Sequence, residues 1–261
     1  MKIRGGVSNL HPLFLAVPGA LTAAGALAYG AAYPRAQIFG KTICRTNSAR
    51  QLALTFDDGP NPAITPKLLD LLERYKAKAT FFLIGRYVRE CPELVKETLA
   101  RGHEIGNHTE SHPNLFWLNP TSVRVELRLC HDAIRGAIGK PPKWFRPPYG
   151  LRNPWVIPAA SELGYRTVMW TLIPGDWREK PAEWLIPRLQ PIAGHAQRSL
   201  GNGSNPAAGT GDVVCLHDGG HRELNGDRSR TLAALEHWLP RWRDLDLEFV
   251  TIGEAVRTPA P

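Results

Sequence analysis

Residues 52–60 read L-A-L-T-F-D-D-G-P, a short apolar β-type run that ends directly in two aspartates, a glycine and a proline. Comparable apolar runs recur after residue 51 and alternate with amphipathic stretches of helical spacing. This alternation is typical of repeated β-α units, and it does not fit an all-β sandwich or a helical bundle. The sequence therefore predicts one domain of the α/β class.

Seven segments have the length and composition of strands, and six stretches between them have helical spacing, several of which open with Pro or a Ser, Thr or Asn cap. The predicted strands are 52–56, 79–84, 103–107, 143–146, 166–170, 212–216 and 247–251. The predicted helices are 66–75, 92–101, 121–138, 154–163, 181–198 and 230–242.

Composition and charge restrict the function classes. The 261 residues are 43% hydrophobic and 21% charged, which is enough to build a core and excludes disordered and collagen-like chains. The formal net charge is +8, but residues 1–45 hold five basic residues and no acid, which leaves 27 basic against 24 acidic residues in the rest. We therefore predict no nucleic-acid partner for the folded domain.

The four cysteines, Cys44, Cys91, Cys130 and Cys215, are widely separated. Their spacing excludes a C-x-x-C metal or redox motif, and their number is too small to define a disulfide framework. They leave the redox compartment open.

The N-terminus carries a candidate targeting segment. Residues 12–33 contain no charge and follow Lys2 and Arg4, as in a signal peptide or a membrane anchor. Small residues around 26–28 would permit cleavage, whereas the basic residues that follow argue against export, and an Ala/Gly-rich soluble extension is the alternative. We predict a signal or anchor segment over 1–45 and a catalytic domain over 46–261. The protein is expected to be membrane-associated or exported, with membrane contact through this segment and the side of the membrane open.

Chemistry in β/α folds gathers where strands end, and the first predicted strand ends in Asp57 and Asp58. The D-D-G-P sequence could be an ordinary surface turn. However, two adjacent carboxylates at a buried strand end repel each other and require a cation or a proton. We interpret them as groups for metal binding or acid–base chemistry.

His108 and His112 follow the third predicted strand in N-H-T-E-S-H-P. A histidine pair four residues apart often arises by chance, but with Asp58 it gives two imidazoles and one carboxylate. That donor set leaves positions for water and substrate on a catalytic zinc, and it suits non-haem iron equally well.

Three further strand ends carry polar residues. Arg146 opens R-P-P-Y-G, Asp176 precedes Trp177, and His217 directly follows the sixth predicted strand. Their alternative interpretations are a rigid proline corner with a solvent-facing arginine, an ordinary loop pair and a structural histidine. The remaining histidines, including His221, are interpreted as structural.

Taken together and in this order, these motifs resemble those of the polysaccharide deacetylase (NodB-homology) family of carbohydrate esterases. The motifs are T-F-D-D-G-P at 55–60, H-T-x-x-H-P at 108–113, R-P-P-Y-G at 146–150, D-W at 176–177 and the strand ending in His217. The resemblance runs from about residue 50 to residue 252. It implies a distorted (β/α) barrel of the NodB-homology type, in agreement with the seven predicted strands. It also implies metal-dependent hydrolysis of an N-acetyl, occasionally O-acetyl, group on a sugar polymer.

Residue by residue, the resemblance implies a divalent metal, usually Zn²⁺, held by Asp58, His108 and His112. It implies that Asp57 is the general base that deprotonates the attacking water and that Arg146 orients it.

On the other side of the reaction, the resemblance implies that His217 is the general acid and that Asp176 tunes it. The backbone N–H of Tyr149 resembles an oxyanion donor, and Tyr149 and Trp177 would wall the acetyl pocket. Many members of the family have Leu where this chain has Cys215, which places Cys215 in that pocket and leaves the pocket width open.

The sequence thus predicts a deacetylase of a glycan that contains N-acetylglucosamine, peptidoglycan-like or chitin-like. One alternative is a deacetylase or deformylase of a lipid-linked amino sugar. Another, of a different class, is a catalytically inactive glycan-binding protein, although such a protein has no need to keep both Asp57 and His217.

Overall fold

The computed structural model of the chain describes residues 24–201 and 209–257, with side chains up to 198 in the first range. In these ranges the strands are β1 Thr42–Ile43, β2 Gln51–Gly59, β3 Ala79–Leu83, β4 Glu104–Asn107, β5 Trp144–Phe145, β6 Arg166–Val168, β7 Asp212–His217 and β8 Glu248–Phe249. The labelled helices are α2 Thr65–Arg74, α3 Gly85–Glu90, α4 Pro92–Ala100, α5 Pro120–Ile138, α6 Val156–Glu162, α7 Ala182–Leu185, α8 Gln190–Gly201, α9 Ser229–Asp244 and α10 Ile252–Ala255.

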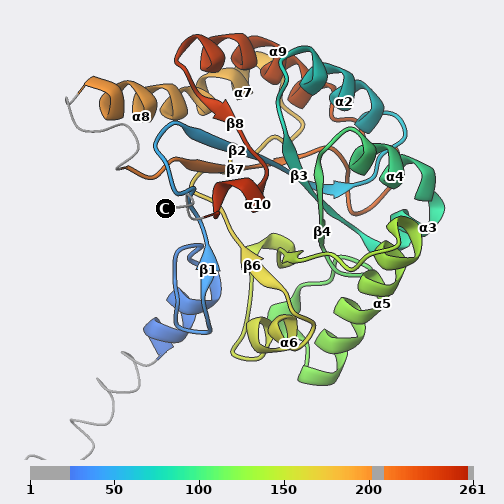
Figure 1. Cartoon of the computed structure of the whole chain (residues 1–261). Helices are drawn as coiled ribbons and strands as arrows, with labels where there is room; N and C mark the ends of the chain where they lie inside the picture. Colours follow the sequence, from blue (N-terminus) through green and yellow to red (C-terminus); the bar gives the residue numbers. More distant parts are fainter. Residues whose placement is uncertain (1–23, 202–208, 258–261) are drawn as a thin grey trace, which may run out of the picture.

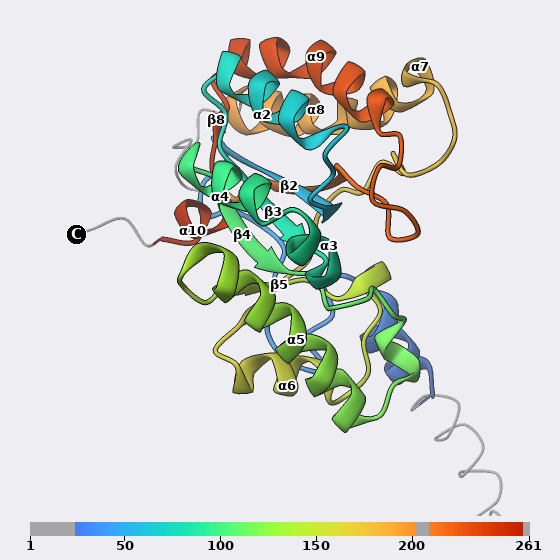
Figure 2. The same cartoon turned by 90° about the vertical axis from the view of Figure 1, so that its right-hand side faces the viewer.

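The strands form one curled parallel sheet with the order β1-β6-β5-β4-β3-β2-β7, and β8 pairs with the start of β2. The sheet curls far enough for isolated bridges to join Leu172 to Val214 and Arg45 to Asp212. Helices cover its outer surface (Figures 1 and 2). The prediction of a distorted (β/α) barrel with about seven strands is confirmed, and β1 is an additional short strand.

The two faces of the curled sheet differ because side chains alternate along each strand. Phe56 of β2 and Leu216 of β7 are buried in the apolar layer between sheet and helices. Their neighbours Asp57 and Cys215 lie on the opposite surface, inside the barrel, because successive strand residues point to opposite faces. One surface of the sheet thus stabilises the fold, and the other carries the polar groups.

The longest helix shows how local sequence sets the element boundaries. The side chain of Asn119 accepts a hydrogen bond from the Ser122 N–H, and Pro120 occupies the first turn of α5. The helix ends at Gly139, which has a φ of 73° that favours glycine. By contrast, the predicted helix 181–198 is divided into α7, a 3-10 segment at Ile186–Leu189 and α8. Pro187 lies at the start of that 3-10 segment and has no N–H to continue an α-helix.

Residues 31–44, which the sequence analysis assigned to the N-terminal segment, pack on the barrel. β1 pairs with β6, and Ala31 and Ala36 are buried. The buried Arg152 donates hydrogen bonds to the carbonyl groups of Tyr33, at 2.6 Å, and Ala36, at 3.2 Å. This stretch is therefore part of the folded unit.

Residues 24–32 are helical, and residues 1–23 of the predicted signal or anchor lie outside the described part. Among the residues that the structure describes, no helix has the length and apolar character needed to cross a bilayer.

Candidate metal and catalytic site

A cavity of about 670 Å³ opens at the carboxyl ends of the strands. Eight of the ten predicted site residues line it, namely Asp57, Asp58, His108, His112, Tyr149, Trp177, Cys215 and His217. The other two, Arg146 and Asp176, are buried behind the lining and contact it through hydrogen bonds. The structure thus brings all ten residues together.

Strand register places an acid and a base side by side. β2 and β7 are adjacent and parallel, with Asp57 opposite His217 and Thr55 opposite Cys215. All four side chains share one face of the sheet because the residues are two apart along each strand. The resulting polar patch lies inside the barrel at the floor of the cavity.

Arg146 holds Asp57 in a buried ion pair. One guanidinium nitrogen lies 2.7 Å from both Asp57 Oδ1 and Thr55 Oγ1. The guanidinium also packs 4.2 Å from the centre of the Phe82 ring. Burial alone would raise the pKa of Asp57, but Arg146, together with His108 and His217, lowers it below its usual value. Asp57 is therefore a carboxylate near neutral pH, and Arg146 is not the solvent-facing residue of the alternative interpretation.

Asp58, His108 and His112 form a second polar group beside Asp57. Asp58 Oδ1 lies 3.2 Å from His112 Nε2 and 3.6 Å from His108 Nε2. His108 is oriented by its Nδ1, which lies 2.7 Å from the carbonyl oxygen of Arg146. Asp58 and His112 both have left-handed backbone angles, with φ values of 71° and 61°, which are uncommon outside glycine and occur at functional sites.

This group fits a divalent cation. Asp58 Oδ1 is buried and has no hydrogen-bond partner, and burial raises the pKa of Asp58 to about 7. Burial also lowers the pKa of His108 to about 4, so its imidazole is neutral, as a metal ligand must be. A cation would compensate the buried carboxylate while two imidazole nitrogens complete a donor set that suits a catalytic ion.

His217 and Asp176 form the opposing charge pair. Asp176 Oδ1 lies 2.8 Å from His217 Nδ1, and Asp176 Oδ2 accepts hydrogen bonds from the His217 N–H and from Thr231 Oγ1. Burial would lower the pKa of His217, but the Asp176 carboxylate outweighs it and raises that pKa to about 9. The imidazole is therefore protonated at neutral pH, with its Nε2 free to donate.

Two aromatic side chains stand at the mouth of the cavity. Tyr149 is 52% exposed and packs edge-on against His112 at 4.6 Å between ring centres. Trp177 packs against His217 at 5.2 Å. Tyr149 has a φ of 58° within a 3-10 turn, and this turn sets the direction of its backbone N–H. These residues can shape a small binding pocket.

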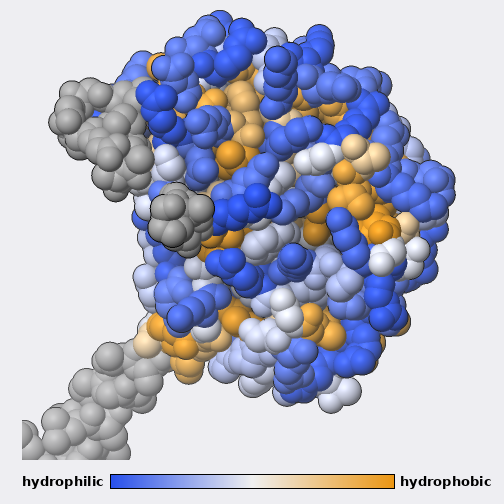
Figure 3. Space-filling model, in the orientation of Figure 1, coloured by the Kyte–Doolittle hydropathy of each residue, from blue (hydrophilic) through white to orange (hydrophobic). Residues whose placement is uncertain are grey.

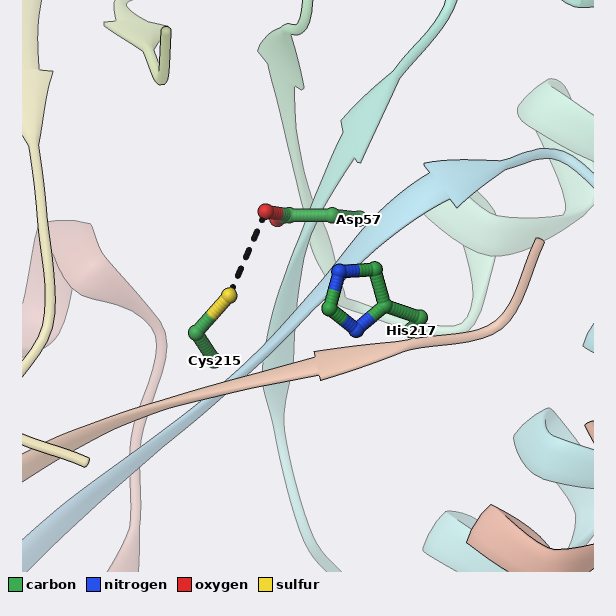
Figure 4. Close-up of side chains that lie close together, drawn as sticks. All are labelled: Asp57, Cys215 and His217. Carbon is green, nitrogen blue, oxygen red and sulfur yellow. Dashed lines mark hydrogen bonds between the residues drawn. The ribbon is translucent and has the colours of Figure 1, made fainter. Parts of the chain in front are cut away.

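Cys215 lies beneath them and is only 1% exposed. Its Sγ donates a hydrogen bond of 3.3 Å to Asp57 Oδ2, as Figure 4 shows. Burial and the neighbouring Asp57 raise the pKa of the thiol well above its usual value. Cys215 is thus a neutral donor to a charged carboxylate in the absence of a cation.

His221 lies in the site, although the sequence analysis interpreted it as structural. Its ring stacks on His112 at 4.5 Å, and its Nδ1 lies 4.0 Å from Asp58 Oδ2. The potential ligand atoms of Asp58, His112 and His221 all lie within 4.8 Å of one another. The available signal was its position four residues after His217, separated by two glycines that let the loop turn back over the strand end.

Comparisons with known proteins agree with this architecture. The sequence profile described as polysaccharide deacetylase matches residues 45–168. A peptidoglycan-N-acetylglucosamine deacetylase of Bacillus cereus is 41% identical over 216 residues, which cover 81% of this chain and 90% of the relative. A chitooligosaccharide deacetylase of Bradyrhizobium sp. is 34% identical over 201 residues, which cover 74% of this chain and 85% of the relative. The crystal structure of a peptidoglycan N-acetylglucosamine deacetylase in complex with 4-naphthalen-1-yl-N-oxidanyl-benzamide matches with a TM-score of 0.68 at 32% identity, covering 82% of this chain and 92% of that one.

Proposed function

The chain belongs to the polysaccharide deacetylase family, and from this premise we propose that it removes N-acetyl groups from a glycan that contains N-acetylglucosamine, of the peptidoglycan or chitin type. The proposal depends on one observation: a single cavity brings together a buried carboxylate, a protonated imidazole and a set of side chains that can bind a divalent cation. Amide hydrolysis needs each of these parts, because the electrophile and the leaving group are both poor.

Asp57 acts as the general base in this proposal. Arg146 holds its Oδ1, so Oδ2 is the oxygen that takes a proton from the attacking water. The strong ion pair keeps Asp57 ionised, and Arg146 is the positioning residue for it. The water oxygen then bonds to the carbonyl carbon, and the backbone N–H of Tyr149 donates to the oxyanion that forms.

His217 acts as the general acid. Asp176 holds its Nδ1 and keeps the ring protonated, so Nε2 faces the cavity with a proton to give. As the C–N bond breaks, this proton passes to the departing nitrogen, which leaves as the amine of the sugar while acetate is the other product.

Asp58, His108 and His112 would hold the divalent metal that the family requires, and we propose that it is Zn²⁺. When bound, the ion supplies a Lewis acid that polarises the carbonyl oxygen and makes a water easier to deprotonate. Zinc is favoured over harder cations by two imidazoles and one carboxylate. His108 keeps its orientation through the Arg146 carbonyl, which links the metal ligands to the base.

The acetyl pocket is proposed to lie between Tyr149, Trp177 and Cys215. The two aromatic rings are exposed at the mouth, and Cys215 is buried at the floor. Aromatic walls can pack on a sugar ring and a methyl group, and the small thiol leaves more room than a leucine would.

The N-terminal segment is proposed to bring the enzyme to the cell envelope. Leu27, Tyr29, Tyr33 and Ile38 are exposed apolar residues, and Figure 3 shows an apolar area where the grey N-terminal trace meets the body. Arg35 and Lys41 are exposed in the same segment and would favour an anionic lipid surface. We propose membrane contact through this segment, whose residues 31–44 also pack on the catalytic domain.

An acetate-release assay on the zinc-loaded full-length chain tests the proposed function. We expect acetate from peptidoglycan or chitin oligomers. Acetylated xylan carries ester acetyl groups, which are easier to hydrolyse than amides, so its rate relative to the amino-sugar substrates measures how strongly the site selects the glycan. The Asp57→Asn variant is the matched control because it changes one atom of the base and little of its volume. Formate release from a formylated amino sugar would favour the deformylase alternative. Tight glycan binding with no release of acetate or formate would overturn the enzymatic assignment.

A further inference from the structure

A second group of potential ligands lies beside the one described above. Asp57, Cys215 and His217 each offer one ligand atom, and these atoms lie within 4.8 Å of one another (Figure 4). The group shares no residue with Asp58, His108 and His112. It is created by the register of β2 and β7, which sets Asp57 opposite His217 with Cys215 two residues earlier on the same face.

Each of Asp57 and His217 has one polar side-chain atom that is already hydrogen-bonded and one that is available to an ion. Arg146 takes Asp57 Oδ1, and Asp176 takes His217 Nδ1. This leaves Asp57 Oδ2 and His217 Nε2, and the Cys215 Sγ lies 3.3 Å from that oxygen. All three residues line the cavity, so an ion can reach them from solvent.

A thiol among these ligands selects the kind of ion. Sulfur is a soft ligand that binds Zn²⁺ and Cd²⁺ well and Mg²⁺ or Ca²⁺ poorly, and three protein ligands leave a fourth tetrahedral position for water. We propose that Asp57, Cys215 and His217 form a second cation site, which binds a thiophilic divalent ion such as Cd²⁺ or excess Zn²⁺ and thereby inhibits the enzyme. The inhibition rests on the proposed function, because an ion here removes the lone pair of the base and the proton of the acid at once.

The proton balance of binding is simple. The S–H bond of Cys215 and the Nε2–H bond of His217 break, the Cys215–Asp57 hydrogen bond is lost, and bonds from sulfur, nitrogen and Asp57 Oδ2 to the cation form. Two protons leave through the cavity to solvent. The buried Arg146 charge opposes a second cation, whereas the Asp57, Asp58 and Asp176 carboxylates favour it. The thiol therefore stays protonated until a soft ion displaces its proton.

The test uses the full chain loaded with one equivalent of Zn²⁺ and then titrated with Cd²⁺. Three quantities are followed: the ultraviolet charge-transfer absorption of the cadmium–thiolate bond, the metals retained per chain after unbound ions are removed, and acetate release. The variant is Cys215→Ser, and the matched control is Cys91→Ser, because Cys91 is a partly exposed thiol that does not line the cavity.

We expect the unaltered chain and Cys91→Ser to retain one zinc and one cadmium, to gain the thiolate band and to lose activity together. In Cys215→Ser the cadmium–thiolate absorption band that arises in the cavity should disappear. The Cd²⁺ concentration that halves the activity of this variant should be at least about tenfold higher than for the unaltered chain. A measurement on the unaltered chain covers the case in which the variant does not fold. There, Cd²⁺ should protect Cys215 from alkylation by iodoacetamide, as located by peptide mass mapping.

Equal inhibition of Cys215→Ser and the unaltered chain, or alkylation of Cys215 at an unchanged rate under Cd²⁺, would overturn the proposal. A thiolate band at Cys215 with full activity would overturn the inhibition and, with it, the roles given to Asp57 and His217. Failure of the zinc-loaded chain to release acetate before any Cd²⁺ is added would count against the proposed function alone. In that case the absorption, the metal content and the protection from alkylation still decide the cation site.

Discussion

Asp57 and Asp58 are neighbours in the chain and are buried to the same degree, but their pKa values are shifted in opposite directions. Asp57 is bonded to Arg146 and Cys215, and its pKa is lowered. Asp58 has an oxygen with no donor, and its pKa is raised to about 7. The fold thus supplies a permanent cation to one carboxylate and leaves the other to be compensated by an ion from solution. In the proposed mechanism, one dipeptide provides both a base and a ligand because its two side chains point in different directions.

The largest expected effect comes from exchanging each carboxylate for an amide. Asp58→Asn should lose both the metal and the activity, because a charged ligand is removed from a three-residue set. Asp57→Asn should retain near-normal metal content while kcat falls by about 10²- to 10⁴-fold, as expected for loss of a general base. Metal analysis of the two purified proteins separates the roles. Equal metal loss in both would contradict the division between them.

The next effect concerns the cation that the protein supplies to Asp57. Arg146→Gln should destabilise the fold by about 3–5 kcal/mol, because it leaves a buried carboxylate unpaired. Urea unfolding measures this change, and part of the loss should return when Asp57→Asn is added. Arg124→Gln is the control, because its pair with Glu162 is exposed and should contribute little. If Arg146→Gln and Arg124→Gln had equal free energies of unfolding, the buried ion pair would not stabilise the fold.

The His217–Asp176 pair is the reverse of the Asp57–Arg146 pair, because here a carboxylate raises the pKa of an imidazole. His217 must be protonated to act as an acid, so kcat/KM should be level below its pKa and fall as the pH rises through about 9. Asp176→Asn should move this decline to lower pH, because the imidazolium loses its partner. The decline should be absent from the residual activity of His217→Ala. An unchanged alkaline limb in that variant would assign the titration to another group.

The smallest expected effect concerns Cys215 as a pocket wall. Relative to Cys215→Leu, the unaltered chain should favour propionyl over acetyl substrates by about 1–3 kcal/mol, the amount that one or two methylene volumes contribute to discrimination. The propionyl-to-acetyl ratio of kcat/KM is the measurement, because effects of the lost hydrogen bond on Asp57 cancel in it. Leu216→Met is the control, since Leu216 faces the helices and should leave the ratio unchanged. An identical ratio in all three proteins would place Cys215 outside the acyl pocket.

Much of this architecture was predictable because its signals are local. The seven expected strands are present, and in parallel β/α folds their carboxyl ends must gather, so the polar residues at 57, 58, 108, 146 and 217 were expected to meet. β1 and α10 were not predicted from the sequence. β1 has two residues within the stretch assigned to the N-terminal segment, and α10 has a capping box between Thr251 and Glu254 but only four residues, too few for a periodic pattern.

Other features depend on distant partners and carry a weak local signal or none. Arg146 is fully buried because Phe82, Thr55 and backbone carbonyl groups of β6 and its extension surround it, and these residues are far from it in sequence. His221 lies in the site because the loop after β7 folds back over His112. The neighbouring residues predict neither the burial of Arg146 nor the stacking of His221 on His112.

Arg152 has a practical consequence for how the enzyme is produced. It donates to Gly150 in the loop that carries Tyr149, and also to Tyr33 and Ala36 upstream of β1. A recombinant protein trimmed to begin at residue 46 would keep every proposed catalytic side chain, yet it would strand a buried guanidinium without two of its acceptors. The loss would fall on the wall of the acetyl pocket, so a trimmed enzyme could give a misleadingly low turnover. Expression boundaries should therefore be drawn upstream of residue 31, and purification tags should be attached after α10, which Figure 2 shows at the side of the sheet opposite to the carboxyl ends of β2, β3 and β4.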